Sequence, residues 1–158
     1  MSIVGFGGQA AFRVIEHTGS AFDGGTGEAH GDKDAANTYT IFTVTDNIVI
    51  WAFAGLCNTS LVGAGTLEVG VAGNTAKLLA QIANTTTLDD GDVWTDANTE
   101  AGIDIAPATG PWFINDGANI VETCSTADIT AGQVDYVMVW TPCNASSNVV
   151  NSGTLSQV

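Results

Sequence analysis

Positive charge is scarce in this sequence. Only three of its 158 residues are Lys or Arg (Arg13, Lys33 and Lys77), against 17 Asp and Glu, and the formal net charge is −14. Nucleic-acid binding needs clustered basic side chains that neutralise phosphates, and an anionic membrane surface attracts the same side chains. Three scattered basic residues therefore argue against nucleic acid and against a membrane surface as partners.

Long apolar segments are also missing. No apolar run approaches the 18 residues that would suggest a membrane-spanning helix. The first twelve residues, MSIVGFGGQAAF, have neither the charged start nor the long apolar stretch of a secretory signal. We therefore expect no membrane partner and no secretory signal.

Cysteine and histidine are too few and too scattered to predict a metal site. Cys57, Cys124 and Cys143 are odd in number and have no CxxC spacing, and His17 and His30 belong to no HExxH motif. The simplest interpretation is that the cysteines are small apolar residues of a chain that folds under reducing conditions, with no zinc site.

One acidic stretch leaves calcium open as an alternative. It contains four aspartates within eight residues, namely Asp89, Asp90, Asp92 and Asp96. Calcium prefers several oxygen ligands from a flexible loop, but the spacing of an EF-hand is absent. A solvated loop is the simpler interpretation. The sequence also has no GxSxG motif and no phosphate-binding loop, so we expect no enzyme activity, no metal and no cofactor.

The residues that are abundant favour β-structure. The chain has 15 Val, 11 Ile and 20 Thr, with 19 Gly and 11 Asn to form turns. β-branched side chains suit a pleated, half-buried surface. Short segments with turn signals every 8 to 12 residues predict an all-β fold with very little helix, namely a β-sandwich or partly closed β-barrel of about eight short strands, of which a jelly roll is one form.

Several segments have a pattern of their own. Residues 39–45 and 48–57 flank Asp46-Asn47 and predict a hairpin, whereas residues 75–82 are the one segment that favours a helical turn. Strands are also expected at residues 11–17, 65–71, 93–94, 102–105, 112–115, 118–124 and 133–141. Residues 48–57 and 133–141 should be long, central strands.

We expect one β domain over residues 1–158, because no linker divides the chain. Its expected irregular parts are a Gly-rich N-terminal segment (1–10), a long loop or arm (18–38) and a polar C-terminal tail (144–158). The strand at 48–57 is apolar on both faces. It must therefore be covered on both sides, or one face must meet another subunit.

The four tryptophans leave a second alternative open. They lie at Trp51, Trp94, Trp112 and Trp140 and could form a platform that stacks on sugars. Tryptophans in a small β domain are more often core or interface residues.

The order of five segments resembles a known family. The segments AHGDKDAANTYTIFTVTDNIVIWAFAGL, GTLEVGVAGNTAKLLAQI, DDGDVWTDA, FINDGANIVETC and ADITAGQVDYVMVWTP span roughly residues 29 to 142. In this order they resemble the capsid decoration, or cement, proteins of tailed bacteriophages. The resemblance implies a β-sandwich or β-barrel body, often trimeric, without catalytic residues.

This resemblance leads to a functional hypothesis. The chain would be a virion structural protein, made in the host cytoplasm, that binds the outer surface of a phage capsid and bridges subunits of the major capsid protein as a homotrimer. The alternative is a carbohydrate- or surface-binding β module of a phage tail or fibre. Candidate interface residues are Trp51, Phe53, Asp23, Glu28, Asp32 and Asp34, the carboxylates meeting Lys or Arg of the capsid.

Overall fold

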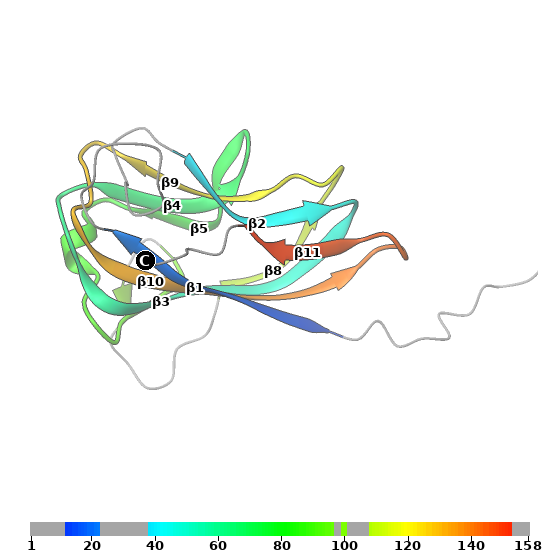
Figure 1. The fold of residues 1–158 in the computed structure, drawn as a ribbon, viewed down its shortest axis with the longest axis horizontal. Helices are drawn as coiled ribbons and strands as arrows, with labels where there is room; N and C mark the ends of the chain where they lie inside the picture. The colour runs from blue at the N-terminus through cyan, green and yellow to red at the C-terminus, as the bar shows by residue number, and fades with distance from the viewer. Residues whose placement is uncertain (1–11, 23–37, 97–98, 101–107, 153–158) are drawn as a thin grey trace, which may run out of the picture.

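The computed structural model describes residues 12–22, 38–96, 99–100 and 108–152, and most of them belong to strands (Figure 1). The strands are β1 (Arg13–Phe22), β2 (Thr38–Thr45), β3 (Ile48–Val62), β4 (Thr66–Val71), β5 (Asn74–Ile82), β6 (Val93–Trp94), β7 (Thr99–Glu100), β8 (Ala108–Ile114), β9 (Ile120–Ser125), β10 (Ala131–Pro142) and β11 (Asn148–Asn151). A single 3-10 turn, η1 (Thr85–Thr87), is the one helical element in these residues.

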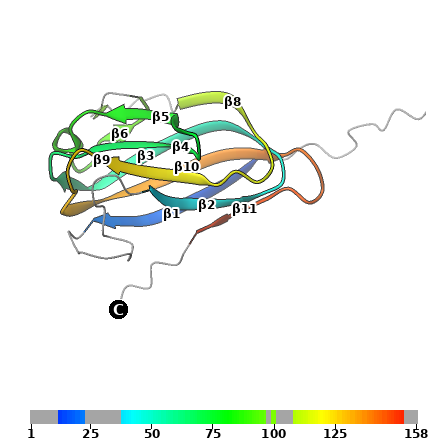
Figure 2. The same ribbon diagram turned by 90° about the horizontal axis from the view of Figure 1, so that it is seen from above.

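The strands form two antiparallel sheets. The six-stranded sheet has the order β1-β10-β3-β6-β7, and β8 also pairs with β3. The five-stranded sheet has the order β11-β2-β9-β4-β5. The two sheets lie face to face as two layers (Figures 1 and 2). The predicted all-β fold is therefore confirmed as a sandwich, and the barrel alternative is not what forms.

The core fills the space between the two sheets. The 15-residue β3 and the 12-residue β10 are neighbours at the centre of the six-stranded sheet, as predicted for residues 48–57 and 133–141. Along β10, Tyr136 and Met138 are buried, whereas Val137 between them is only partly buried. Alternate side chains of a strand point to opposite faces of its sheet, so one set enters the core and the other leaves it.

The helical turn predicted for residues 75–82 is wrong, because this segment is β5, which pairs with β4. The buried residues Leu78, Leu79 and Ile82 have helix-like spacing because a register shift interrupts the ladder between the two strands. The two-residue turn Ala72–Gly73, with φ of 85° at the glycine, folds the chain straight back onto β4. Pairing in the sheet thus outweighs the local preference of Ala, Lys and Leu for helix.

The predicted hairpin of residues 39–45 and 48–57 is also wrong. The turn at Asp46–Asn47 exists, but β2 pairs with β9 and β11, whereas β3 pairs with β10, β8 and β6. The turn therefore carries the chain from the five-stranded sheet to the six-stranded sheet. A turn signal gives the position of a turn, but it does not tell which strands pair on either side.

Two segments expected to be irregular contain strands. Residues 18–22, assigned to the long arm, continue β1 along β10 as far as Phe22. In the tail, β11 lies beside β2 at the edge of the five-stranded sheet. The strand expected at 102–105, the N-terminal segment and most of the arm lie outside the described residues.

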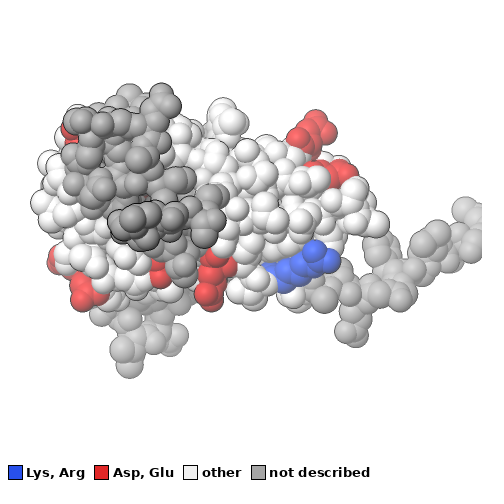
Figure 3. Space-filling view, in the orientation of Figure 1, with Lys and Arg blue, Asp and Glu red and all other residues white. Residues whose placement is uncertain are grey.

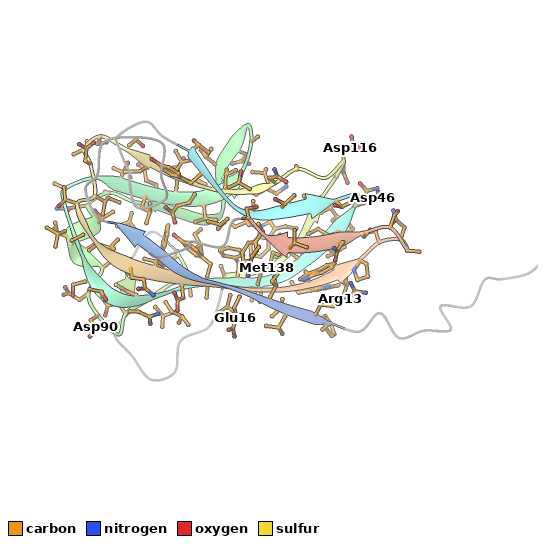
Figure 4. The ribbon with its side chains drawn as sticks, in the orientation of Figure 1. Arg13, Glu16, Asp46, Asp90, Asp116 and Met138 are labelled. Atoms are coloured by element: carbon orange, nitrogen blue, oxygen red, sulfur yellow. The ribbon has the colours of Figure 1, made fainter. Side chains whose placement is uncertain are left out.

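Hydrogen bonds join three turns at one end of the sandwich, around Asp46 and Asn47. The Gly117 amide donates to the Asp46 carbonyl (3.2 Å), and the Cys143 amide donates to the Asn47 carbonyl (3.0 Å). The Ser146 hydroxyl donates to the Asp46 carboxylate (2.6 Å) and, together with Asn144, holds the pKa of that carboxyl below its ordinary value. Asp46 and Asp116 both lie at this end in Figure 4.

Candidate interaction surface

The six-stranded sheet has apolar side chains on both of its faces. One face packs on the five-stranded sheet. On the other, the paired positions Val139 and Ala52 lie side by side, and so do Val137 and Ala54. In Figure 4, Met138 points between the two layers, whereas Glu16, which pairs with Val137, lies on the opposite side of the sheet. We call this opposite side the outer face. It is formed by Phe12, Val14, Val49, Trp51, Ala52, Ala54, Leu56, Phe113, Val137 and Val139.

Three aromatic rings lie at one end of the outer face, and all three are exposed. Phe12 is 65% exposed, Phe113 64% and Trp51 39%. The pairing runs across the sheet from Thr141 to Val49 and from Val49 to Phe113, while Phe12 directly precedes β1 at its edge. With about 4.8 Å between neighbouring strands, the row from β1 to β8 is roughly 14 Å wide.

A β-bulge places Trp51 on this face. In the β3–β10 ladder, Val139 pairs with Ala52 and Trp140 with Ile50, so Trp51 is the extra residue between them. Bulges commonly redirect a side chain in this way. The Trp51 indole N–H donates to the Thr141 hydroxyl oxygen (3.0 Å), and the Phe12 ring meets the Trp51 ring edge to face, with 5.7 Å between their centroids.

Charge is nearly absent from the outer face. The charged side chains that alternate onto this face in β1 and β10 are Glu16 and Asp135, and the Lys77 ammonium of β5 donates to the Phe113 carbonyl at its edge (3.4 Å). Glu16 belongs to the edge strand β1, and Asp135 pairs with Leu56 away from the aromatic end. Arg13 alternates to the inner side, with its guanidinium 5.0 Å from the centre of the Trp140 ring. Figure 3 views the two layers from the side and shows several separate acidic patches, with one basic patch where Figure 4 labels Arg13.

The structure separates the two apolar candidates for the interface. Trp51 lies on the outer face. Phe53 lies in the core with none of its surface exposed, and its ring packs against Phe42 and Tyr136. Register shifts around Trp51 put these two residues on opposite faces, although they are two positions apart in sequence. The acidic candidates Asp23, Glu28, Asp32 and Asp34 lie outside the described residues.

Sequence reasoning did not select Phe113 as a surface residue. Its neighbours Trp112 and Ile114 alternate with it, and Ile114 is buried. That alternation was a usable signal for two faces of a strand, but it does not say which face is covered. The face is decided by the pairing of Phe113 with Val49, a residue 64 positions earlier in the chain.

The acidic loop forms an ordinary turn in the structure. The Asp89 amide donates to the Asp92 carboxylate (3.0 Å), and the Asp90 amide donates to the Ser60 hydroxyl (2.9 Å). Gly91 has a φ of 89°, which a glycine adopts without strain. Within the described ranges, no group of three or more His, Cys, Asp or Glu side chains is arranged to hold a metal ion.

A buried hydrogen bond joins the two sheets. The Tyr136 hydroxyl of β10 donates to Oε2 of Glu122 of β9 (2.6 Å), and neither residue is exposed. Burial, and then the nearby Glu122, raise the pKa of Tyr136 well above its ordinary value. The rings of Phe53 and Trp94 pack against Tyr136, and the pair has no exposed surface, so this buried hydrogen bond links the two layers.

The thiols are free in this structure. Cys57 and Cys124 are buried, as expected, whereas Cys143 is exposed near the turn at Asn47. Burial raises the pKa of the Cys57 thiol to about 11. These buried thiols therefore behave as small apolar side chains.

Comparisons of the chain with protein-family models, with curated proteins and with solved structures found no match. In the part of the chain that the structure describes, no helix has the length and apolar character needed to cross a membrane.

Proposed function

We propose that this chain is a virion structural protein, a decoration protein that binds the outside of a tailed-phage capsid and stabilises it. Its role is binding without catalysis, and its partners are copies of itself, as a homotrimer, and the major capsid protein. The segment order over residues 29 to 142 is what suggests the phage family. The observation that carries the proposal is the outer face, because a sheet that is apolar on both sides is suited to assembly.

The mechanism combines a covered apolar face with an acidic exterior. Burying apolar strand surface holds an assembly together, and the net charge of −14 keeps its exterior soluble. Carboxylates such as Asp23, Glu28, Asp32 and Asp34 would pair with Lys or Arg of the capsid, and such contacts weaken as salt rises. Many copies at symmetric sites make a weak individual contact strong through avidity.

The alternative, a carbohydrate-binding module, was suggested by a platform of four tryptophans, which does not form because Trp94 and Trp140 are buried in the core and Trp112 packs against it. The rings that a sugar could meet on the outer face are those of Phe12, Trp51 and Phe113. Two details of the outer face disfavour this alternative. The rings of Phe12 and Trp51 are inclined at 76° to each other, so they do not form one flat platform for a sugar ring. The Trp51 indole N–H is also already bonded to Thr141, so it is engaged within the chain and less available to a sugar hydroxyl.

The test is binding to empty capsids assembled from the major capsid protein encoded in the same genome. Capsids are mixed with increasing amounts of the chain and sedimented, and their heat resistance is followed by calorimetry. We expect saturable binding, weaker at high salt, and a higher melting temperature of the capsid. A chain that stays in the supernatant at every ratio and salt concentration refutes the proposal. A parallel array of polysaccharides tests the alternative.

A further inference from the structure

Four features of the outer face bear on what covers it, namely its size, its polar groups, its charge and the scarcity of other apolar surface that could pair with it. At about 200 Å² for an aromatic side chain, the exposed fractions of Phe12, Trp51 and Phe113 leave roughly 340 Å² of aromatic surface open. That alone is a sizeable part of the roughly 800 Å² that each partner buries in a stable interface. Val14, which is 63% exposed, extends the same surface along β1.

The polar group at the centre of this surface is already satisfied. An indole N–H that loses water without gaining a partner opposes association, because burying an unpaired polar group costs free energy. Here Thr141 of the neighbouring strand accepts that hydrogen bond within the same chain. The Trp51 ring can therefore be buried against another apolar surface without losing a hydrogen bond.

Charge selects the kind of partner. Two copies with a net charge of −14 repel each other wherever their acidic surfaces approach. The described aromatic end of the outer face, around Trp51, carries no acidic side chain, and Glu16 and Asp135 lie away from it. A contact between copies is therefore least opposed at this end. A partner with a basic surface, in contrast, would find little there to pair with.

The distribution of exposed apolar side chains also favours contact between the outer faces of two copies. Apart from the outer-face residues named above, the large apolar side chains exposed in the described residues are Val62, at the far end of β3, and Val150, on β11 of the other sheet. The best apolar match that the described surface offers to one outer face is therefore the same face of another copy.

We propose that the outer face is buried against the outer faces of other copies of this chain, with Phe12, Trp51 and Phe113 turned towards the symmetry axis. In the proposed homotrimer, three such faces surround a threefold axis. This inference rests on the homo-oligomeric part of the proposed function and concerns the chain by itself, before any capsid is present.

The experiment measures the mass of the full chain in solution, without capsids, by sedimentation equilibrium over a range of concentrations. Val14→Asp and Phe113→Asp each place a carboxylate at an exposed position of the outer face. Val150→Asp is the matched control, because Val150 is 48% exposed on β11 of the other sheet. Circular dichroism checks that each variant keeps its strands.

We expect a mass of three chains, or of two, for the wild type and for Val150→Asp. Val14→Asp and Phe113→Asp should dissociate, with at least a roughly hundredfold weaker association, because like charges would be desolvated at the axis. A wild type with the mass of one chain overturns the inference, and so do folded outer-face variants that keep the wild-type mass. An oligomer that fails to bind capsids refutes the decoration role alone, whereas a monomer that binds capsids refutes this inference and the homotrimer on which it rests but leaves the decoration role standing.

Discussion

Removing the Tyr136 hydroxyl should lower the free energy of unfolding, because this group links the two sheets by a buried hydrogen bond. Tyr136→Phe keeps the ring and its contacts with Phe53 and Trp94, whose ring centroids lie 6.0 and 6.3 Å away. The change therefore removes one hydrogen bond, at 2.6 Å, between two side chains with no exposed surface. A hydrogen bond to a charged group contributes about 1.5–3 kcal/mol, so we expect the free energy of unfolding to fall by about 2 kcal/mol.

The assay is urea unfolding at pH 7, followed by tryptophan fluorescence, with thermal unfolding as a second probe. For a domain of this size, about 2 kcal/mol corresponds to a fall in Tm of roughly 4–8 °C. Tyr39→Phe is the matched control, because it makes the same chemical change at the chain's other tyrosine, which is half-buried. We expect that control to cost less than Tyr136→Phe, because Tyr39 is only half-buried whereas Tyr136 has no exposed surface.

A double-mutant cycle makes the test specific. Glu122→Gln and the double variant with Tyr136→Phe should give a coupling energy of about 1–2 kcal/mol, since the two side chains touch directly. If Tyr136→Phe lowers stability no more than Tyr39→Phe does, or if the coupling energy is near zero, the buried hydrogen bond contributes nothing and the reasoning fails.

Three further predictions follow from other parts of the sandwich. Iodoacetamide at pH 8 should modify Cys143 quickly and Cys57 only after unfolding, as read by mass spectrometry, because burial raises the Cys57 pKa to about 11. Rapid modification of both thiols in the folded chain would contradict this. In urea unfolding, Gly132→Ala should lower the free energy of unfolding by about 2–4 kcal/mol, and Gly73→Ala by about 1 kcal/mol. Both glycines have positive φ, but the added methyl carbon meets a neighbour only at Gly132, where it would lie 2.8 Å from the Cα of Leu61. Equal losses would refute the packing argument. Hydrogen bonds from Ser146 and Asn144 lower the pKa of Asp46 in the folded chain. The ionised carboxylate therefore stabilises the fold at any pH above the ordinary aspartate pKa, and this stabilisation is lost as the pH falls through the lowered pKa. Asp46→Asn should therefore reduce the loss of stability between pH 5 and pH 2 in urea titrations, and an unchanged acid profile would argue against it.

Local patterns predicted the parts of the fold that depend on local chemistry. The strands predicted at residues 65–71 and 133–141 form, because the two-residue alternation of apolar side chains is a property of the strand itself. The failure at residues 75–82 arose because a register shift in the β4–β5 ladder produces the spacing of a helix. That shift depends on the partner strand, which a local window does not contain.

The candidate surface divides in the same way. Trp51 was predicted to lie near a contact because residues 48–57 are apolar on both faces, and the structure places it on the outer face. Phe53 was grouped with it because the bulge at Trp51 is set by pairing with β10, about 90 positions later in the chain. Phe113 was missed for the same reason, since its face depends on the register with β3.

The order of strands in the six-stranded sheet has a consequence for synthesis on the ribosome. The longest strand, β3, ends at Val62, but its main partner, β10, begins only at Ala131. At about 5–20 residues per second, translation of the intervening chain takes roughly 3–14 s. During this interval a strand that is apolar on both sides lacks the neighbour that completes its sheet. Folding dominated by such distant pairings is slow, so the nascent chain should depend on chaperone binding around residues 48–62 until β10 has left the ribosome.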